Sequence, residues 1–182
     1  MIGRSIALYL HILGAITLFV AAGVVQLGGS RVRGASTLEE LRTWLKLVGG
    51  TQGMFAAGFF ALLATGLYLA YRGFTYETSW IVVGLASLIL MAVLGGAVAG
   101  RTLAGIGRAA GGTGPIPPEL RLRILSPTPW AAGTAANGMG LGVVWLMVNK
   151  PGWAESLGVV IALGVLGALI GRTLATSGTR AA

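Results

Sequence analysis

The stretch WIVVGLASLILMAVLGGAVAG, at residues 80–100, carries no charged side chain along its whole length. At about 1.5 Å of rise per residue, a helix over these positions spans roughly the 30 Å hydrocarbon core of a bilayer. Similar apolar stretches lie before and after it in the chain. The sequence therefore predicts five membrane-spanning helices, at about residues 5–28, 51–71, 80–100, 130–148 and 156–172.

The composition agrees with this prediction. Apolar residues make up 55% of the chain and charged residues 10%, and the mean hydropathy is +0.83, whereas soluble proteins carry about 25% charged residues. Many of the 31 glycines lie within the apolar stretches, where small residues let membrane helices approach closely. We expect an all-α polytopic membrane bundle that forms a single transmembrane domain over residues 1–182.

The amino-terminal stretch has features of a secretory signal peptide, because one arginine precedes an apolar run with small residues near its end. That run is longer than the roughly 7–15 apolar residues of a signal peptide. We therefore expect an uncleaved first span.

Basic residues alternate between the two sides of the five predicted crossings. Ten basic residues lie on the side opposite the amino terminus, and they are Arg31, Arg33, Arg42, Lys46, Arg101, Arg108, Arg121, Arg123, Arg172 and Arg180. The amino-terminal side has three, which are Arg4, Arg72 and Lys150. The positive-inside rule then predicts an outside amino terminus and a cytoplasmic carboxyl terminus. The same rule accounts for the net charge of +8, so we expect no nucleic-acid partner.

The first cytoplasmic loop is expected to form a short amphipathic helix. Ser36 with Glu39, or Thr37 with Glu40, has the spacing of a capping box. The following apolar residues share one helical face, and they are Leu38, Leu41, Leu45 and Val48. We expect this helix to lie on the membrane surface.

The third loop is expected to have two parts. Its first part, Gly105–Gly114, is rich in Gly and Ala and is predicted to be an irregular, mobile loop. A proline-rich segment then precedes a second short basic helix at about Glu119–Leu125, since Pro suits the first turn of a helix. We expect Arg121 and Arg123 of this helix to contact anionic lipid headgroups.

His11 is the polar residue of greatest interest within the predicted spans. The simplest interpretation is a histidine that bonds a neighbouring helix or faces the outer interface. The alternative is an axial haem ligand or a copper ligand, because neutral imidazole is a common metal ligand. Met147, a symmetry-related copy or a partner subunit would then have to supply the second ligand. The small hydroxyls in the spans are expected to bond their own helix backbone, and they are Thr17, Thr65, Ser87 and Thr134.

Small residues form smooth faces on the fourth and fifth predicted spans. Asn137, Gly138 and Gly142 lie on the fourth span, and Gly167 and Gly171 lie on the fifth. Such faces support close helix packing, and an amide can hydrogen-bond across them. We expect these residues to pack within the bundle, with self-association through one of the faces as the alternative.

Reactive groups are scarce. The chain has no Cys and no Asp, and no Glu lies deep in a predicted span. These absences remove thiolate metal sites and paired-carboxylate chemistry, and ion-coupled pumps usually use an acidic residue at membrane depth. We do not expect an enzyme.

Several short motifs resemble a family of bacterial integral-membrane proteins that is known only as a domain of unknown function. In order along the chain, these motifs are LHILGA at 10–15, TGLYLA at 65–70, PPELR at 117–121 and WLMVNKP at 145–151. The first motif is also distantly similar to the first helix of copper-resistance D type proteins. In those proteins an early His is followed by Trp-Gly-Gly, and here residues 17–22 read TLFVAA instead. Only His11 carries over from that similarity.

The sequence thus favours a multi-pass protein of the bacterial cytoplasmic (inner) membrane. Its expected function is that of a non-enzymatic accessory or scaffold subunit, either as a homo-oligomer or within a larger membrane complex. The main alternative is a membrane protein that binds haem, copper or a small hydrophobic ligand through His11. A uniporter or channel is a further alternative.

Overall fold

The computed structural model describes residues 2–75 and 77–177. The helices in order are α1 (Ile2–Gly34), α2 (Leu38–Gly50), α3 (Gln52–Gly73), α4 (Ser79–Ala92), the π-helix η1 (Val93–Gly100), α5 (Arg101–Ala109), α6 (Pro118–Ile124), α7 (Pro127–Asn149) and α8 (Trp153–Ser177). No β-strand occurs among these residues, and one isolated bridge joins Thr37 to Pro115. The all-α prediction is confirmed.

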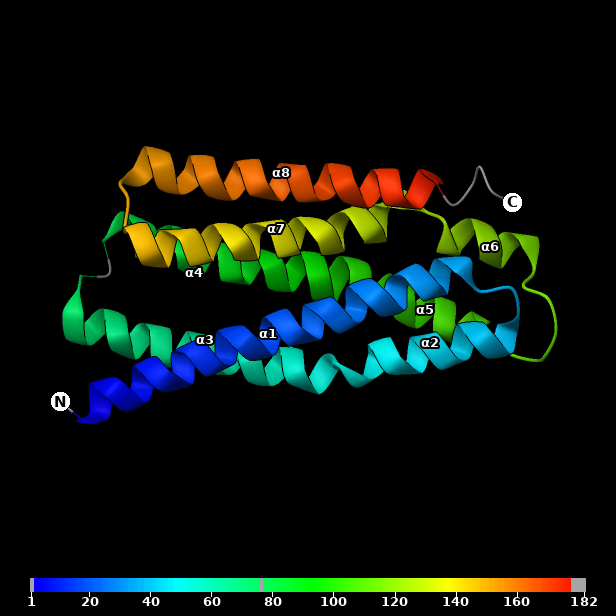
Figure 1. Cartoon of the computed structure of the whole chain (residues 1–182), viewed down its shortest axis with the longest axis horizontal. Helices are drawn as coiled ribbons and strands as arrows, with labels where there is room; N and C mark the ends of the chain where they lie inside the picture. Colours follow the sequence, from blue (N-terminus) through cyan, green and yellow to red (C-terminus); the bar gives the residue numbers. More distant parts are fainter. Residues whose placement is uncertain (1, 76, 178–182) are drawn as a thin grey trace.

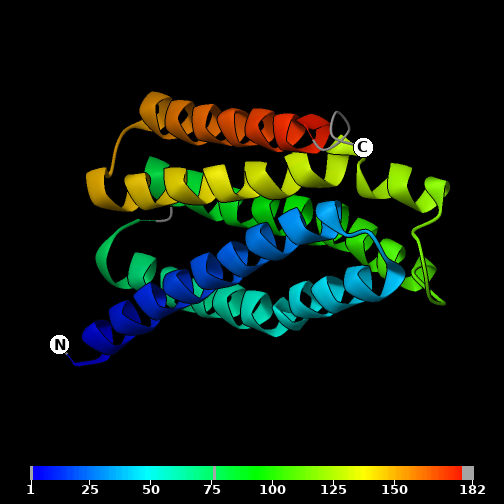
Figure 2. The same cartoon turned by 45° about the vertical axis from the view of Figure 1, so that its right-hand side comes forward.

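Five helical stretches are long and apolar enough to cross a membrane, as the sequence predicts. They are Ile2–Gly34, Leu38–Gly73, Ser79–Ala109, Pro118–Asn149 and Trp153–Ala175. The helices run side by side along the long axis of the molecule, and α1 begins at the opposite end from that at which α8 ends (Figures 1 and 2). Arg180 lies outside the described residues.

The spanning helices associate as two groups. α1 packs mainly against α3, whereas α7 packs mainly against α8 and also contacts α4 and η1. α1 crosses the bundle obliquely, so that its last turns approach the start of α7 while its first turns diverge from α7 (Figures 1 and 2). The two groups are therefore joined most closely at one end of the molecule.

That end carries most of the basic residues, and we call it the basic end. The last turns of α1, all of α2 and α5, α6 and the start of α7 meet there around a common apolar core (Figure 1). We call this core the basic-end cluster, and it consists of Val32, Ala35, Leu38, Leu41, Val48, Leu103, Ile106, Ala110, Leu120, Ile124, Trp130 and Ala175.

Several helices are longer than a bilayer requires, and the parts that extend beyond it form the basic end. The 33 residues of α1 extend about 50 Å at 1.5 Å per residue, compared with a hydrocarbon core of about 30 Å. α2 continues almost in line with α3, with a break at Thr51, instead of lying across the helix ends (Figures 1 and 2). The short amphipathic helix is thus present, but it prolongs a spanning helix where we expected it to lie flat.

The second predicted pair, Thr37 and Glu40, caps the start of α2, but Glu40 bonds the residue before the N-cap instead of the N-cap itself. The hydroxyl of Thr37 accepts from the backbone N–H of Glu40, and the carboxylate of Glu40 accepts from the backbone N–H of Ser36. Glu39 instead accepts from the backbone N–H of Gly114, which ties α2 to the loop after α5.

The predicted irregular loop at Gly105–Gly114 is wrong in its first half. α5 continues through Gly105 to Ala109, because Leu103 and Ile106 share one face and are buried in the basic-end cluster. The second short helix is confirmed as α6, which has a proline in its first turn.

Candidate functional site

His11 lies in α1 on the side that packs against α3. Its Nδ1 is 3.0 Å from the hydroxyl oxygen of Thr65, and its ring rests against the open face of Gly66. A Cβ at Gly66 would lie 3.2 Å from the His11 Cε1, so the missing side chain makes room for the imidazole. The interpretation of His11 as a histidine bonded to a neighbouring helix therefore agrees with this geometry.

The direction of this hydrogen bond can be assigned from the Thr65 hydroxyl. That hydroxyl has one proton, and it donates it to the carbonyl of Ala61. Its oxygen therefore accepts from His11, which makes Nδ1 the protonated nitrogen of the neutral ring. The other nitrogen, Nε2, then keeps its lone pair and can accept a hydrogen bond or bind a metal.

Met147 lies in α7, and its terminal methyl group approaches Gly84 of α4, where a Cβ would be 3.4 Å from the Met147 Cε. His11 instead contacts α3, and α1 and α7 diverge toward the amino-terminal end of α1 (Figures 1 and 2). The structure shows no contact between these two side chains. Among the described residues, no group of three or more His, Cys, Asp or Glu side chains gathers as a metal site.

The four predicted packing glycines all lie in the contact between α7 and α8. A Cβ at Gly138 or Gly167 would collide with the backbone of the facing helix, at Leu163 and Thr134 respectively. A Cβ at Gly142 would lie 3.0 Å from the Val160 Cα, and one at Gly171 would lie 2.5 Å from the Trp130 carbonyl oxygen. These glycine faces are thus used inside the chain, and in this arrangement they are not free for self-association.

Asn137 is partly buried on α7. Its neighbours along the helix, Gly133 and Gly140, face Ala99 of η1 and Phe19 of α1. Its amide makes no hydrogen bond with any residue in the described part of the chain. The small hydroxyls behave as predicted, since Thr17, Thr65, Ser87 and Thr134 all donate to carbonyls of their own helices.

Arg121 joins α6 to the end of α1. Its guanidinium donates to the carbonyls of Arg33, at 3.1 Å, and of Ala35, at 2.6 Å. The last carbonyls of a helix have no partner within the helix and carry its negative dipole end, so a cation is stabilised there. Arg121 therefore closes a helix end, a role that the sequence pattern did not indicate.

Arg123 is exposed and differs from Arg121. One of its Nη atoms would lie 3.2 Å from a Cβ at Gly105, and an Nη atom of Arg108 would lie 4.0 Å from the same point. Two guanidinium groups thus gather above Gly105 at the outer surface of the basic end. Two neighbouring guanidinium groups repel each other, so an anionic group between them would be stabilised.

Further contacts tie the basic end together. Arg42 donates to the carbonyls of Ala110, at 3.3 Å, and Gly112, at 2.6 Å. The guanidinium of Arg33 lies 4.5 Å from the centre of the Trp130 ring. The Trp130 indole N–H donates to the Ile124 carbonyl at 2.8 Å. This cluster was not predicted from the sequence, although the apolar spacing of Leu103, Ile106 and Ala110 between arginines could have indicated a helix with a buried face.

The comparisons with known proteins agree with the fold. No curated protein and no solved structure matches the chain. The sequence model of one family, described as a predicted integral membrane protein (DUF2269), matches residues 5–151. That match covers four of the five spanning stretches and the whole basic-end cluster except Ala175. The chain therefore belongs to the DUF2269 family of predicted integral membrane proteins.

Proposed function

We propose that this chain is a non-enzymatic accessory or scaffold subunit of the bacterial cytoplasmic membrane, and that its basic end binds an acidic surface of a partner membrane protein. The observation that carries the proposal is the basic-end cluster, in which helix ends are packed on an apolar core and held by arginine-to-carbonyl hydrogen bonds. A surface that is already ordered binds a partner at a lower entropic cost.

The outer surface of this end supports a partner of negative charge. Arg108 and Arg123 converge above Gly105, and Leu122, the neighbour of Arg123 in α6, is 73% exposed. An exposed apolar side chain next to a cation is typical of a contact that combines packing with charge complementarity. A second copy would present the same cations, so charge favours a different subunit over self-association through this face.

In-cell photocrosslinking tests the proposal. A photoreactive residue placed at Leu122 should give one discrete protein adduct, and the double variant R108E/R123E should abolish it. The matched control is Leu141 of α7, which is 56% exposed within a spanning helix and should yield no such adduct. Adducts at Leu122 with lipid alone, or with a second copy of this chain, would overturn the proposal.

A second candidate function rests on Nε2 of His11, which carries the lone pair of the ring in the assigned tautomer. A neutral imidazole with Nδ1 held by Thr65 is oriented as metal-binding histidines commonly are. The candidate is a protein that binds haem or copper at this position with a second ligand from a partner. The absorption spectrum and metal content of the membrane-purified protein test it, because H11A should remove a Soret band or bound copper. A colourless, metal-free wild-type protein would reject it.

A further inference from the structure

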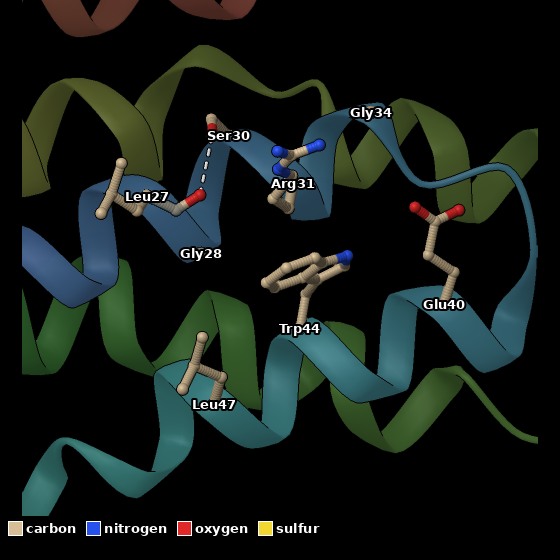
Figure 3. Close-up of a pocket in the computed structure, with 8 residues that line it drawn as sticks. All are labelled: Leu27, Gly28, Ser30, Arg31, Gly34, Glu40, Trp44 and Leu47. Atoms are coloured by element: carbon tan, nitrogen blue, oxygen red, sulfur yellow. Dashed lines mark hydrogen bonds between the residues drawn. The ribbon is translucent and has the colours of Figure 1, made fainter.

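A pocket of about 620 Å³ lies between the last turns of α1 and the antiparallel helix α2. Figure 3 shows its lining as three successive levels. Leu27 and Leu47 lie at one end, Arg31 lies over Trp44 in the middle, and Glu40 lies at the other end. Its volume falls within the range of roughly 300–1,000 Å³ typical of small-molecule sites.

These levels are ordered along the predicted membrane normal. Leu27 lies near the end of the uncharged run of α1, which stops at Ser30. Arg31 lies about 6 Å beyond Leu27 along the helix, at 1.5 Å per residue. α2 runs in the opposite direction, so Leu47 is nearest to the spanning helix α3 and Glu40 is furthest from it. The pocket therefore changes from apolar to charged at the depth where hydrocarbon gives way to lipid headgroups.

Both charged groups are held in place. The guanidinium of Arg31 lies 5.7 Å from the centre of the Trp44 ring, which restrains it by a cation–π contact. One carboxylate oxygen of Glu40, Oε2, accepts from the backbone N–H of Ser36 at 3.0 Å and from its hydroxyl at 3.2 Å. Glu40 also has a side-chain hydrogen bond with Trp44 and is attracted electrostatically by Arg31. Trp44 therefore helps to hold both charged groups in place.

Arg31 and Glu40 do not bond each other. Among the eight residues drawn in Figure 3, the one hydrogen bond marked joins Ser30 to the Leu27 carbonyl. Opposite charges on two levels of one open pocket, without direct contact, match a molecule that carries both charges. Its anionic group would lie nearer to the bilayer centre and its cationic group further out.

We propose that this pocket binds the headgroup of phosphatidylethanolamine. The phosphate accepts hydrogen bonds from the Arg31 guanidinium, which suits phosphate geometry. The primary ammonium donates to the Glu40 carboxylate, and the first carbons of the acyl chains lie against Leu27 and Leu47. An anionic headgroup meets repulsion from Glu40, and a quaternary ammonium has no N–H to donate to its carboxylate.

Native mass spectrometry of the intact, delipidated protein tests this assignment. The probes are phosphatidylethanolamine, phosphatidylcholine and phosphatidylglycerol with identical acyl chains. The wild-type protein should retain phosphatidylethanolamine about threefold to fivefold more strongly than the other two, the size expected for one exposed charge pair. E40Q should remove that preference, and R31Q should weaken all three lipids.

The variants are chosen to preserve the fold. Gln replaces Glu in capping boxes, so E40Q keeps an acceptor for the Ser36 N–H. The matched controls are E119Q and R101Q, which change exposed charges of the same basic end outside the pocket. Equal retention of the three lipids by the wild type, a preference for phosphatidylglycerol, or the same loss in E119Q as in E40Q would overturn the proposal.

Discussion

The basic-end cluster and the contact between α7 and α8 are packed in opposite ways. The cluster buries large aliphatic side chains, and Leu41, Ile106, Ile124 and Val32 are four of the six largest fully buried side chains in the described residues. The α7–α8 contact instead brings glycines against the backbone of the facing helix. Met139, Leu146 and Val160 are also buried on α7 and α8, but the closest approach of these two helices is made at glycines.

The difference follows from the solvent that each region meets. Burial of a leucine is favourable when the alternative is water, because apolar surface leaves the aqueous phase. Within lipid the alternative is equally apolar, so helices associate through close van der Waals packing of small residues. The packing pattern therefore indicates that the basic end lies outside the hydrocarbon and the α7–α8 contact lies within it.

The largest effect should come from truncating the cluster. L41A removes a side chain with no exposed surface and should lower the free energy of unfolding by about 2–5 kcal/mol. Equilibrium unfolding in a fixed detergent measures it. The control L169A, at a position 54% exposed on α8, should change stability by less than about 0.5 kcal/mol. Equal losses in the two variants would mean that the cluster is not a water-driven core.

The α7–α8 contact should be destabilised by added side-chain volume, whereas the basic-end cluster is destabilised by lost volume. G167A places a Cβ against the Thr134 carbonyl and should cost about 1–3 kcal/mol of unfolding free energy. G158A on the same helix meets nothing within 4 Å and should be neutral or stabilising by up to about 1 kcal/mol, since Ala favours helix over Gly. The same sign of change in both variants would contradict the close α7–α8 approach.

Variants of Arg121 and Arg123 compare an arginine that bonds a helix end with an arginine that is exposed. R121Q removes the charge that faces the Arg33 and Ala35 carbonyls and should cost about 1–2 kcal/mol in the same unfolding measurement. R123Q should stay within about 0.5 kcal/mol of wild type. If both variants instead kept full stability but lost binding to anionic vesicles, the headgroup role predicted from the sequence would apply to both.

The smallest effect is expected at His11. T65V removes the interhelical hydrogen bond to His11 together with the bond of the hydroxyl to its own helix at Ala61. The interhelical bond should account for about 0.6 kcal/mol. A sharper readout is ¹⁵N NMR of the single histidine, in which the wild-type proton should reside on Nδ1 and the T65V proton should shift toward Nε2. An Nε2-protonated wild type would contradict the assigned direction of the Thr65 bond.

The sequence was sufficient for the five spanning stretches because their signal is local. A charge-free run such as residues 80–100 identifies a membrane helix without knowledge of its neighbours. The bonds of small hydroxyls such as Ser87 to their own helix were predictable for the same reason.

The sequence was insufficient where partners lie far apart along the chain. Arg121 bonds carbonyls 86 and 88 residues away, and His11 bonds a hydroxyl 54 residues away. The end of α5 was missed because Gly-rich composition suggested a loop, whereas burial of Ile106 against α2 and α6 stabilises the helix. Tertiary packing overrode local propensity at that position.

The π-helix η1 between α4 and α5 has a consequence for chain length in this family. Its hydrogen bonds connect residues five apart instead of four, so one residue more is accommodated than in a regular turn. A natural deletion of one position between Met91 and Arg101 would restore ordinary α-helical winding there. Shorter homologues should therefore keep Leu103 and Ile106 directed inward, and gaps in alignments of the family should concentrate at this point.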